Sequence, residues 1–151
     1  MIRIYTDGSY KPTTNQGGYG VVITENNFIQ KILYYGYKNT TNNRMELLAV
    51  LTALQYFDKP TEFEIYSDSS YIVSSINNGY LFKWISDNDT TKLNMDLWKK
   101  IYKLLNFHKV KFIWVKGHAE NEFNNLADFY ANIASIILNP EIDENQSKEN
   151  S

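Results

Sequence analysis

Four carboxylates in this chain of 151 residues stand in settings unlike those of ordinary surface acids. They are Asp7 in Thr-Asp-Gly-Ser, Glu46 in Asn-Asn-Arg-Met-Glu, Asp68 in Tyr-Ser-Asp-Ser and Asp128 in Leu-Ala-Asp. Carboxylates held close together repel one another, and their oxygens are the ligands that hard cations such as Mg²⁺ prefer. If the fold gathers these four side chains, we expect a metal centre made of oxygen ligands.

Each acid also has a simpler structural explanation. Asp7 and Asp68 could cap the backbone of a turn, and Glu46 could be an acid favoured by the dipole of a first helical turn. Asp128 could be an ordinary solvent-facing residue. None of these explanations accounts for the contexts of all four acids together, so we prefer the metal-binding interpretation.

Composition limits the alternatives. A chain of 151 residues that is 43% hydrophobic fits one domain with a single packed core. It has no cysteine, which excludes disulfides and thiolate metal sites. The first residues lead directly into a strand pattern, without a charged leader or a long apolar run, so we expect a cytoplasmic protein with no membrane segment.

The charge is unevenly distributed along the chain. The formal net charge is −2, but the last eleven residues alone carry −3. Residues 1–140 hold 14 basic and 13 acidic groups, so their net charge is +1, and it becomes +5 when the four acids described above are set aside. With metals bound to the four acids, residues 1–140 would thus attract phosphate groups moderately, and this attraction should weaken as the salt concentration rises.

The hydrophobic pattern predicts an α/β fold. Strands are expected at 2–7, 19–24, 28–37, 62–67 and 110–115, with a hairpin turn at 26–27, and helices at 45–57, 70–76, 95–105 and 124–138. This order indicates a five-stranded mixed sheet flanked by helices. We expect a domain over residues 1–139 and an acidic, disordered tail over residues 140–151.

These elements place the acids. Gly8-Ser9 is expected to end the first strand, so Asp7 and Asp68 both stand at strand ends, where open α/β sheets collect ligands. Glu46 lies in the first turn of its helix, on a stripe with Val50 that should face the sheet. The last helix is expected to turn inward Leu126, Tyr130, Ile133 and Ile137, with Asp128 on another face.

Five motifs give the chain a family resemblance. They are Tyr-Thr-Asp-Gly-Ser at 5–9, Gly-Gly-Tyr-Gly at 17–20, Thr-Thr-Asn-Asn-Arg-Met-Glu-Leu at 40–47, Ser-Asp-Ser at 67–69 and Trp-Val-Lys-Gly-His-Ala at 114–119. In this order and spacing, from residue 2 to about 138, the chain resembles the type 1 ribonucleases H, especially the stand-alone bacterial kind.

The resemblance implies a ribonuclease H-like fold and endonucleolytic hydrolysis of the RNA strand of RNA–DNA hybrids, which leaves 5′-phosphate and 3′-hydroxyl ends. Asp7, Glu46, Asp68 and Asp128 match the family's ligands for two Mg²⁺ ions, and Mn²⁺ should support some activity. His118 matches a loop histidine that could pass a proton or help the product leave. We expect a monomer, and we assign no role to His108, which we expect to be exposed.

The resemblance also suggests substrate contacts. The residues concerned are Thr13, Asn15, Thr41, Asn42, Asn43 and Trp84. Thr41 or Asn42 could in addition cap the following helix, and Trp98 is expected in the core. The segment 77–93, where the family carries a basic handle, is short here and holds only Lys83 and Lys92. This predicts either weaker substrate binding or a shift of binding toward the following helix, at Lys99, Lys100 and Lys103.

Two other functions remain open. The chain could be a hybrid-binding module without turnover, although retention of all the acids argues against this. It could also be the ribonuclease H domain of a reverse transcriptase. The methionine directly before the first strand and the acidic tail favour a stand-alone chain.

Overall fold

The computed structural model describes residues 1–117, 121–137 and 139–143. In these residues a mixed sheet has the strand order β5-β4-β1-β2-β3-β6. The strands are β1 (Ile2–Lys11), β2 (Gln16–Glu25), β3 (Phe28–Lys38), β4 (Glu62–Ser67), β5 (Lys109–Trp114) and β6 (Glu141–Ile142). β1, β2 and β3 form an antiparallel meander, β4 and β5 continue the sheet in parallel to β1, and β6 runs parallel to β3.

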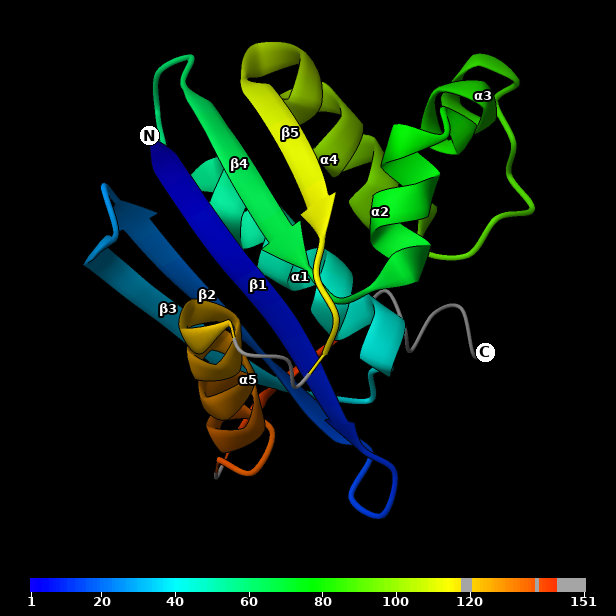
Figure 1. The fold of residues 1–151 in the computed structure, drawn as a ribbon. Coiled ribbons are helices and arrows are strands. Elements are labelled where there is room, and N and C mark those ends of the chain that lie inside the picture. Colours follow the sequence, from blue (N-terminus) through cyan, green and yellow to red (C-terminus); the bar gives the residue numbers. More distant parts are fainter. Residues whose placement is uncertain (118–120, 138, 144–151) are drawn as a thin grey trace.

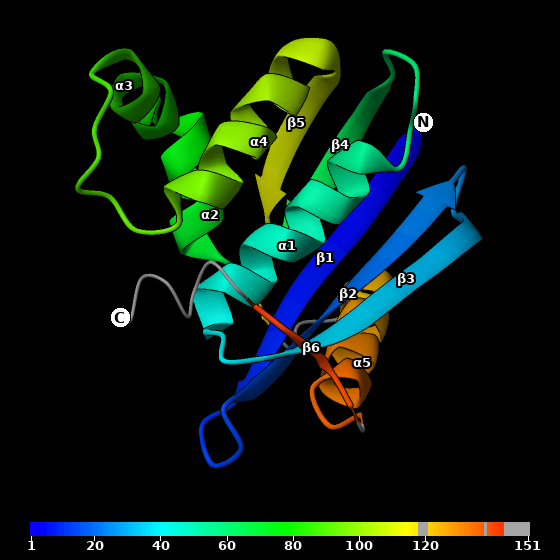
Figure 2. The same cartoon turned by 180° about the vertical axis from the view of Figure 1, so that it is seen from behind.

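Helices lie on both faces of the sheet, as expected for an α/β fold. They are α1 (Asn42–Gln55), α2 (Ser70–Asn77), α3 (Tyr80–Ser86), α4 (Met95–Phe107) and α5 (Glu122–Ala134). Figure 1 shows α5 in front of the sheet, and the reverse view in Figure 2 shows α1 and α4 on the other face. No helix in the described part of the chain is long and apolar enough to cross a membrane.

The main core lies between the sheet and the helices α1 and α4. Ile4 of β1 and Ile65 of β4 are fully buried, as are Val50 of α1 and Trp98 of α4. The expected core position of Trp98 is therefore confirmed. Val50 and Glu46 lie one turn apart on the face of α1 that packs on the sheet, so the apolar stripe of this helix carries a carboxylate inward as predicted.

The antiparallel partner β2 keeps β1 extended beyond Asp7. We expected Gly8-Ser9 to end this strand, and that expectation is wrong, because pairing with β2 continues to Lys11. Parallel pairing of β1 with β4 nevertheless stops at Thr6 and Ser67. Asp7 and Asp68 each follow this last pair directly, so they lie side by side at the carboxyl end of the parallel part of the sheet.

The face of α5 that packs on the sheet differs from our prediction. Instead of Leu126, Tyr130, Ile133 and Ile137, the buried residues of the helix are Asn124, Ala127, Ala131 and Ala134. The cause is three glycines of β2 and β3, above all Gly20, where an added Cβ would collide with the carbonyl oxygen of Ala127. Because the sheet offers bare backbone here, α5 approaches it with small side chains, and larger residues of the helix such as Leu126 are only partly buried around them.

Three further expectations need correction. The sheet has a sixth strand, because β6 pairs with the end of β3, so residues 141–143 do not belong to a disordered tail. α3 forms in the segment expected to be irregular. His108 is only 6% exposed: its Nδ1 accepts a hydrogen bond from Thr61 N at 3.1 Å, which makes Nε2 the donor to Leu54 O at 2.9 Å.

Candidate active site

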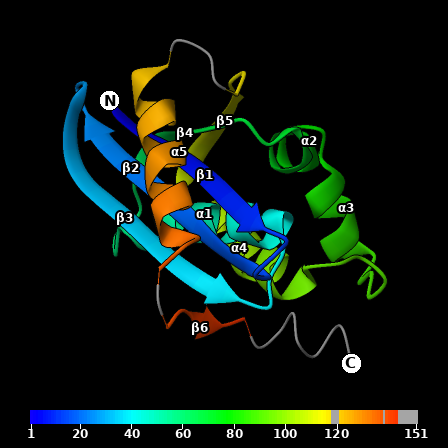
Figure 3. The same ribbon diagram turned by 90° about the horizontal axis from the view of Figure 1, so that it is seen from below.

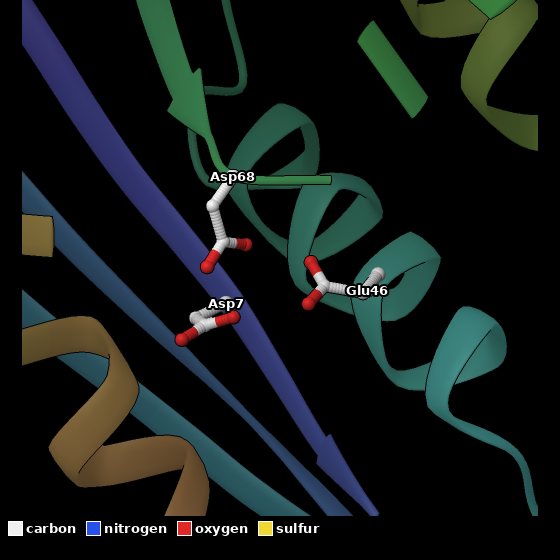
Figure 4. Close-up of side chains that lie close together, drawn as sticks. All are labelled: Asp7, Glu46 and Asp68. Carbon is white, nitrogen blue, oxygen red and sulfur yellow. The ribbon is translucent and has the colours of Figure 1, made fainter. Parts of the chain in front are cut away.

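Three of the predicted acids meet at the carboxyl end of β1 and β4. A carboxylate oxygen of each of Asp7, Glu46 and Asp68 lies within 4.8 Å of the others. Figure 4 shows Asp7 on β1, Asp68 just after β4 and Glu46 reaching across from α1. With Asp128 they line an open, polar cavity of about 420 Å³. The fold therefore gathers all four carboxylates, although Asp128 is not among the three in closest contact.

Gly8 allows α1 to approach β1 closely. Its N–H donates to Asp7 Oδ1 at 2.9 Å and to Glu46 Oε1 at 3.0 Å, so one backbone amide joins the two acids. A Cβ on Gly8 would lie 2.6 Å from the backbone nitrogen of Glu46. Any residue other than glycine would push α1 away, which explains why the Asp-Gly pair belongs to the site.

The second oxygen of Glu46 indicates what the site binds. Glu46 is 4% exposed, and its Oε2 is buried with no hydrogen-bond partner among the described residues. Leaving a buried carboxylate oxygen unsatisfied is costly, so this atom favours a cation or a proton nearby. An all-oxygen donor set with this geometry suits a hard divalent cation such as Mg²⁺.

Burial and mutual repulsion change the acidity of the pair. Burial first, and then the charge of Glu46 and a hydrogen bond with it, raise the pKa of Asp7 to about 11. Burial raises the pKa of Glu46 to about 8, although the hydrogen bond with Asp7 opposes this change. Without a cation the pair therefore keeps a proton at neutral pH, which a bound metal would displace.

The backbone around Asp68 is fixed by its neighbours. Ser69 caps α2, since its hydroxyl accepts from Ile72 N at 3.3 Å, and its own N–H donates to Ser67 Oγ at 3.0 Å. The indole N–H of Trp114 donates to the carbonyl oxygen of Asp68 at 3.2 Å. These bonds turn the chain sharply after β4, so the Asp68 side chain points into the cavity.

A second set of bonds ties the turn of α5 that holds Asp128 to β1. Asn132 Nδ2 donates to the carbonyl oxygen of Asp128 at 3.0 Å. Asn132 Oδ1 accepts from Ser9 Oγ at 2.8 Å and from Lys11 Nζ at 2.9 Å. No role was predicted for these three residues from the sequence; the spacing of Asn132, one turn after Asp128, was the only available signal.

The predicted substrate residues separate into two groups. Asn42 and Asn43 line the cavity of the acids, while Thr41 caps α1, with Arg44 N donating to its hydroxyl at 3.1 Å. Thr13 and Asn15 lie in the turn between β1 and β2, away from that cavity. The side-chain amide of Asn15 makes two hydrogen bonds: its Oδ1 accepts from Tyr10 OH at 2.7 Å, and its Nδ2 donates to Asn39 Oδ1 at 3.2 Å.

Trp84 lies on α3, beside a different cavity of about 200 Å³ that Lys99 also lines. Its ring contacts that of Trp98, and Lys92 Nζ lies 5.3 Å from its centroid. His118 lies outside the described residues. The residue before it, Gly117, is near the acids, because a Cβ there would lie 3.0 Å from Asp68 Oδ2.

Comparison with known proteins identifies the family. The family model described as RNase H matches residues 1–136. This chain belongs to the ribonuclease H family. It is 43% identical over 135 residues to a protein named ribonuclease H from Chlorobium phaeobacteroides (strain BS1), covering 86% of this chain and 92% of the relative. A relative of the same name from Prosthecochloris aestuarii (strain DSM 271 / SK 413) is 44% identical, with the same coverage.

Solved structures give the same result for this ribonuclease H. The crystal structure of LC9-RNase H1, described as a type 1 RNase H with the type 2 active-site motif, superposes with a TM-score of 0.75 at 26% identity. The match covers 89% of this chain and 71% of that one. The expected ribonuclease H-like fold is therefore confirmed.

Proposed function

We propose that this ribonuclease H is a metal-dependent endonuclease that hydrolyses the RNA strand of RNA–DNA hybrids and leaves 5′-phosphate and 3′-hydroxyl ends. The observation that carries the proposal is the cluster of the buried Asp7 and Glu46 with the half-buried Asp68, in a cavity that also holds Asp128. The names of the family's curated relatives support it.

Asp7, Glu46, Asp68 and Asp128 would hold two Mg²⁺ ions once substrate is bound, and Mn²⁺ should substitute. Bound there, the ions would supply an activated water and neutralise the charge of the leaving oxygen. The unsatisfied Glu46 Oε2 and the proton retained by the Asp7 and Glu46 pair support this assignment. The amide of Gly8 holds the two acids in a fixed relation before any cation arrives.

The chain's own polar groups would recognise the hybrid. Asn42 and Asn43 at the rim of the cavity can donate to and accept from a 2′-hydroxyl or a phosphate, without reading base sequence. We assign weaker supporting contacts to Thr13, Asn15, Thr41 and Trp84. His118 would exchange a proton near the cleaved phosphate or assist product release, and the position of Gly117 beside Asp68 supports this.

We also propose that the protein acts as a monomer in the cytoplasm. The alternatives, a hybrid-binding module without turnover or a domain of a reverse transcriptase, are not better supported, because the curated relatives are named ribonuclease H and are matched over about nine tenths of their length. The binding module in particular would have no use for a cluster of acids, which repels the phosphates of any nucleic acid until cations bind.

Cleavage of an RNA strand labelled at its 5′ end tests the proposal. The strand is presented alone, annealed to RNA, or annealed to DNA, in Mg²⁺ or in EDTA, and the ends of the products are identified. We expect internal cuts only in the hybrid, only with Mg²⁺, and with 3′-hydroxyl ends. Cutting of free RNA at an equal rate, or cutting in EDTA, would contradict it.

A further inference from the structure

Arg44, in the first turns of α1, is a buried charged side chain outside the acid cluster. It is 1% exposed and contacts two carboxylates with both edges of its guanidinium. Its Nε and Nη2 donate to Asp143 at 2.7 and 3.1 Å, and its Nη1 and Nη2 donate to Asp96 at 3.0 and 2.8 Å. Such paired contacts fix both the distance and the angle between the groups.

Asp143 is itself held by the sheet. Its N–H donates to Lys38 O at 3.0 Å, continuing the pairing of β6 with β3, and its Oδ2 accepts from Thr40 Oγ1 at 3.1 Å. Glu141 accepts from Tyr35 OH at 2.8 Å. Figure 3 shows β6 beside the end of β3. We call residues 141–143 the C-terminal clasp; they lie beyond the residues 1–136 that the family model matches.

The clasp meets α1 where the helix carries its functional residues. Arg44 follows Asn43 directly and precedes Glu46 by two positions, so the guanidinium anchors the same turns that present these side chains to the cavity. Helical backbone is stiff over one turn, so an anchor on one face fixes the side chains on the other. Asp143, at 7% exposure, is the more buried of the two carboxylates that hold Arg44; Asp96 is 24% exposed.

We propose that the C-terminal clasp is a positioning element of the active site: Asp143 acts through Arg44 to hold Asn42, Asn43 and Glu46 at their places in the cavity. The effect of the clasp on catalysis rests on the proposed function, whereas its effect on the backbone of α1 does not. The competing explanation is that the clasp only adds stability. A positioning role predicts that kcat and KM change in fully folded protein that lacks the clasp, whereas a purely stabilising role predicts that they do not.

A pair of truncations separates the clasp from the rest of the tail. One protein ends after Asp143 and keeps the clasp; the other ends after Pro140 and lacks it. Asp143→Asn in the full chain preserves β6 and removes only the charge, in case the shorter protein does not fold. Ile23→Val, at a buried position on β2, serves as a control that lowers stability far from Arg44. All are assayed on hybrid with Mg²⁺, at a temperature where circular dichroism shows them folded.

We expect the protein ending after Asp143, and Ile23→Val, to keep kcat and KM within about twofold of the full chain. Ending after Pro140, or Asp143→Asn, should raise KM and lower kcat, with a combined loss in kcat/KM of about tenfold or more, because small displacements of positioned groups slow catalysis strongly. Unchanged constants in a folded variant without the clasp would overturn the proposal. So would an equal loss in the protein that ends after Asp143.

Amide hydrogen exchange tests the clasp without relying on activity. Met45 N–H, bonded to Thr41 O at 3.1 Å, reports on the start of α1, and Leu54 N–H reports on its other end. In Asp143→Asn we expect exchange at Met45 to accelerate about tenfold more than at Leu54, because only the first turns lose their anchor. Equal acceleration at both amides would overturn the proposal. If the full chain cleaves no hybrid, the proposed function fails, and this measurement alone still decides on the clasp.

Discussion

At the scale of single residues, the acid cluster is unfavourable for the fold unless cations are present. The pKa of Glu46 is raised to about 8 and that of Asp7 to about 11, both first of all by burial. A carboxyl whose folded pKa exceeds its unfolded pKa binds more protons in the folded state, so stability falls as pH rises between the two values. The interval begins near the ordinary carboxyl pKa of about 4.

Asp7→Asn tests this linkage. In EDTA we expect the melting temperature of the native chain to fall as pH rises from about 5 to about 8. The substitution should weaken that fall and raise the melting temperature at the upper end, because it removes a buried carboxyl that the folded state keeps protonated and the unfolded state does not. Mg²⁺ should raise the melting temperature of the native chain more than that of the variant. Asp58→Asn, at a position away from the acid cluster, is the control. A native melting temperature that rises over this interval would contradict the account.

Asn132 provides a second test at this scale. Asn132→Ala removes the bonds that link Asp128 O to Ser9 and Lys11, so the turn that holds Asp128 is no longer tied to β1. We expect kcat on hybrid to fall about tenfold, with KM changed little, since the substrate-facing asparagines are untouched. Asn132→Asp keeps the acceptor for Ser9 and Lys11, so its kcat should fall less than that of Asn132→Ala. An unchanged kcat in Asn132→Ala would show that Asp128 needs no such support.

The acids could be found from sequence because motif and chemistry agree on them. The residues that support them could not. Ser9 and Asn132 are 123 positions apart, and Arg44 and Asp143 are 99 apart, so no local pattern connects them. Likewise, the polar neighbours of His108 suggested exposure, whereas two backbone groups from distant segments satisfy its ring in the interior.

At the scale of elements, the approach of α5 to the sheet decides where Asp128 lies. Periodicity identified this helix but assigned the wrong face, because large apolar residues were taken as the buried ones. Gly18, Gly20 and Gly36 instead leave room for backbone contact with alanines of α5. The rule that large apolar residues face inward fails where the sheet itself has no side chains to pack against.

Gly20→Ala should therefore destabilise the protein by about 2–3 kcal/mol, as overpacking does, and lower activity by displacing Asp128. Gly79→Ala is the matched control: its backbone has φ 79°, but nothing lies within 4 Å of the added Cβ. In that variant the free energy of unfolding should fall by only about 1 kcal/mol, because of backbone strain, and activity should be kept. Urea denaturation measures both. A smaller loss for Gly20→Ala than for Gly79→Ala would contradict the packing argument.

At the scale of the whole molecule, the order of elements was predictable and the ends of the sheet were not. Long alternating strands and amphipathic helices leave a clear pattern, so the meander, α1, β4, α4 and β5 were found. β6 has only two residues, too few for any periodicity, and the residue after it, Asp143, contacts Arg44, which is distant in the sequence. The tail's acidic composition suggested disorder for the same residues.

Charge distribution over the molecule predicts how binding depends on salt. Lys99 lines the cavity beside Trp84, whereas Lys59 lies at the opposite end of the sheet from the acids, before β4. We expect Lys99→Gln to lower the slope of log Kd for hybrid against log salt by about 1, and Lys59→Gln to leave it unchanged. Binding is measured with Asp7→Asn to avoid cleavage. If the slope is the same for Lys99→Gln and for the parent, Lys99 contacts no phosphate of the hybrid, and the cavity beside Trp84 is not part of the substrate-binding surface.

The most direct test of the central claim is single-turnover cleavage of an RNA–DNA hybrid with Mg²⁺ by the native chain and by Asp7→Asn, with hybrid binding measured in parallel. If the gathered acids form the metal centre, the native chain cuts the RNA strand, and the variant binds the hybrid but loses cutting by about 10³-fold or more. Cutting by the variant at a rate close to that of the native chain would contradict the claim.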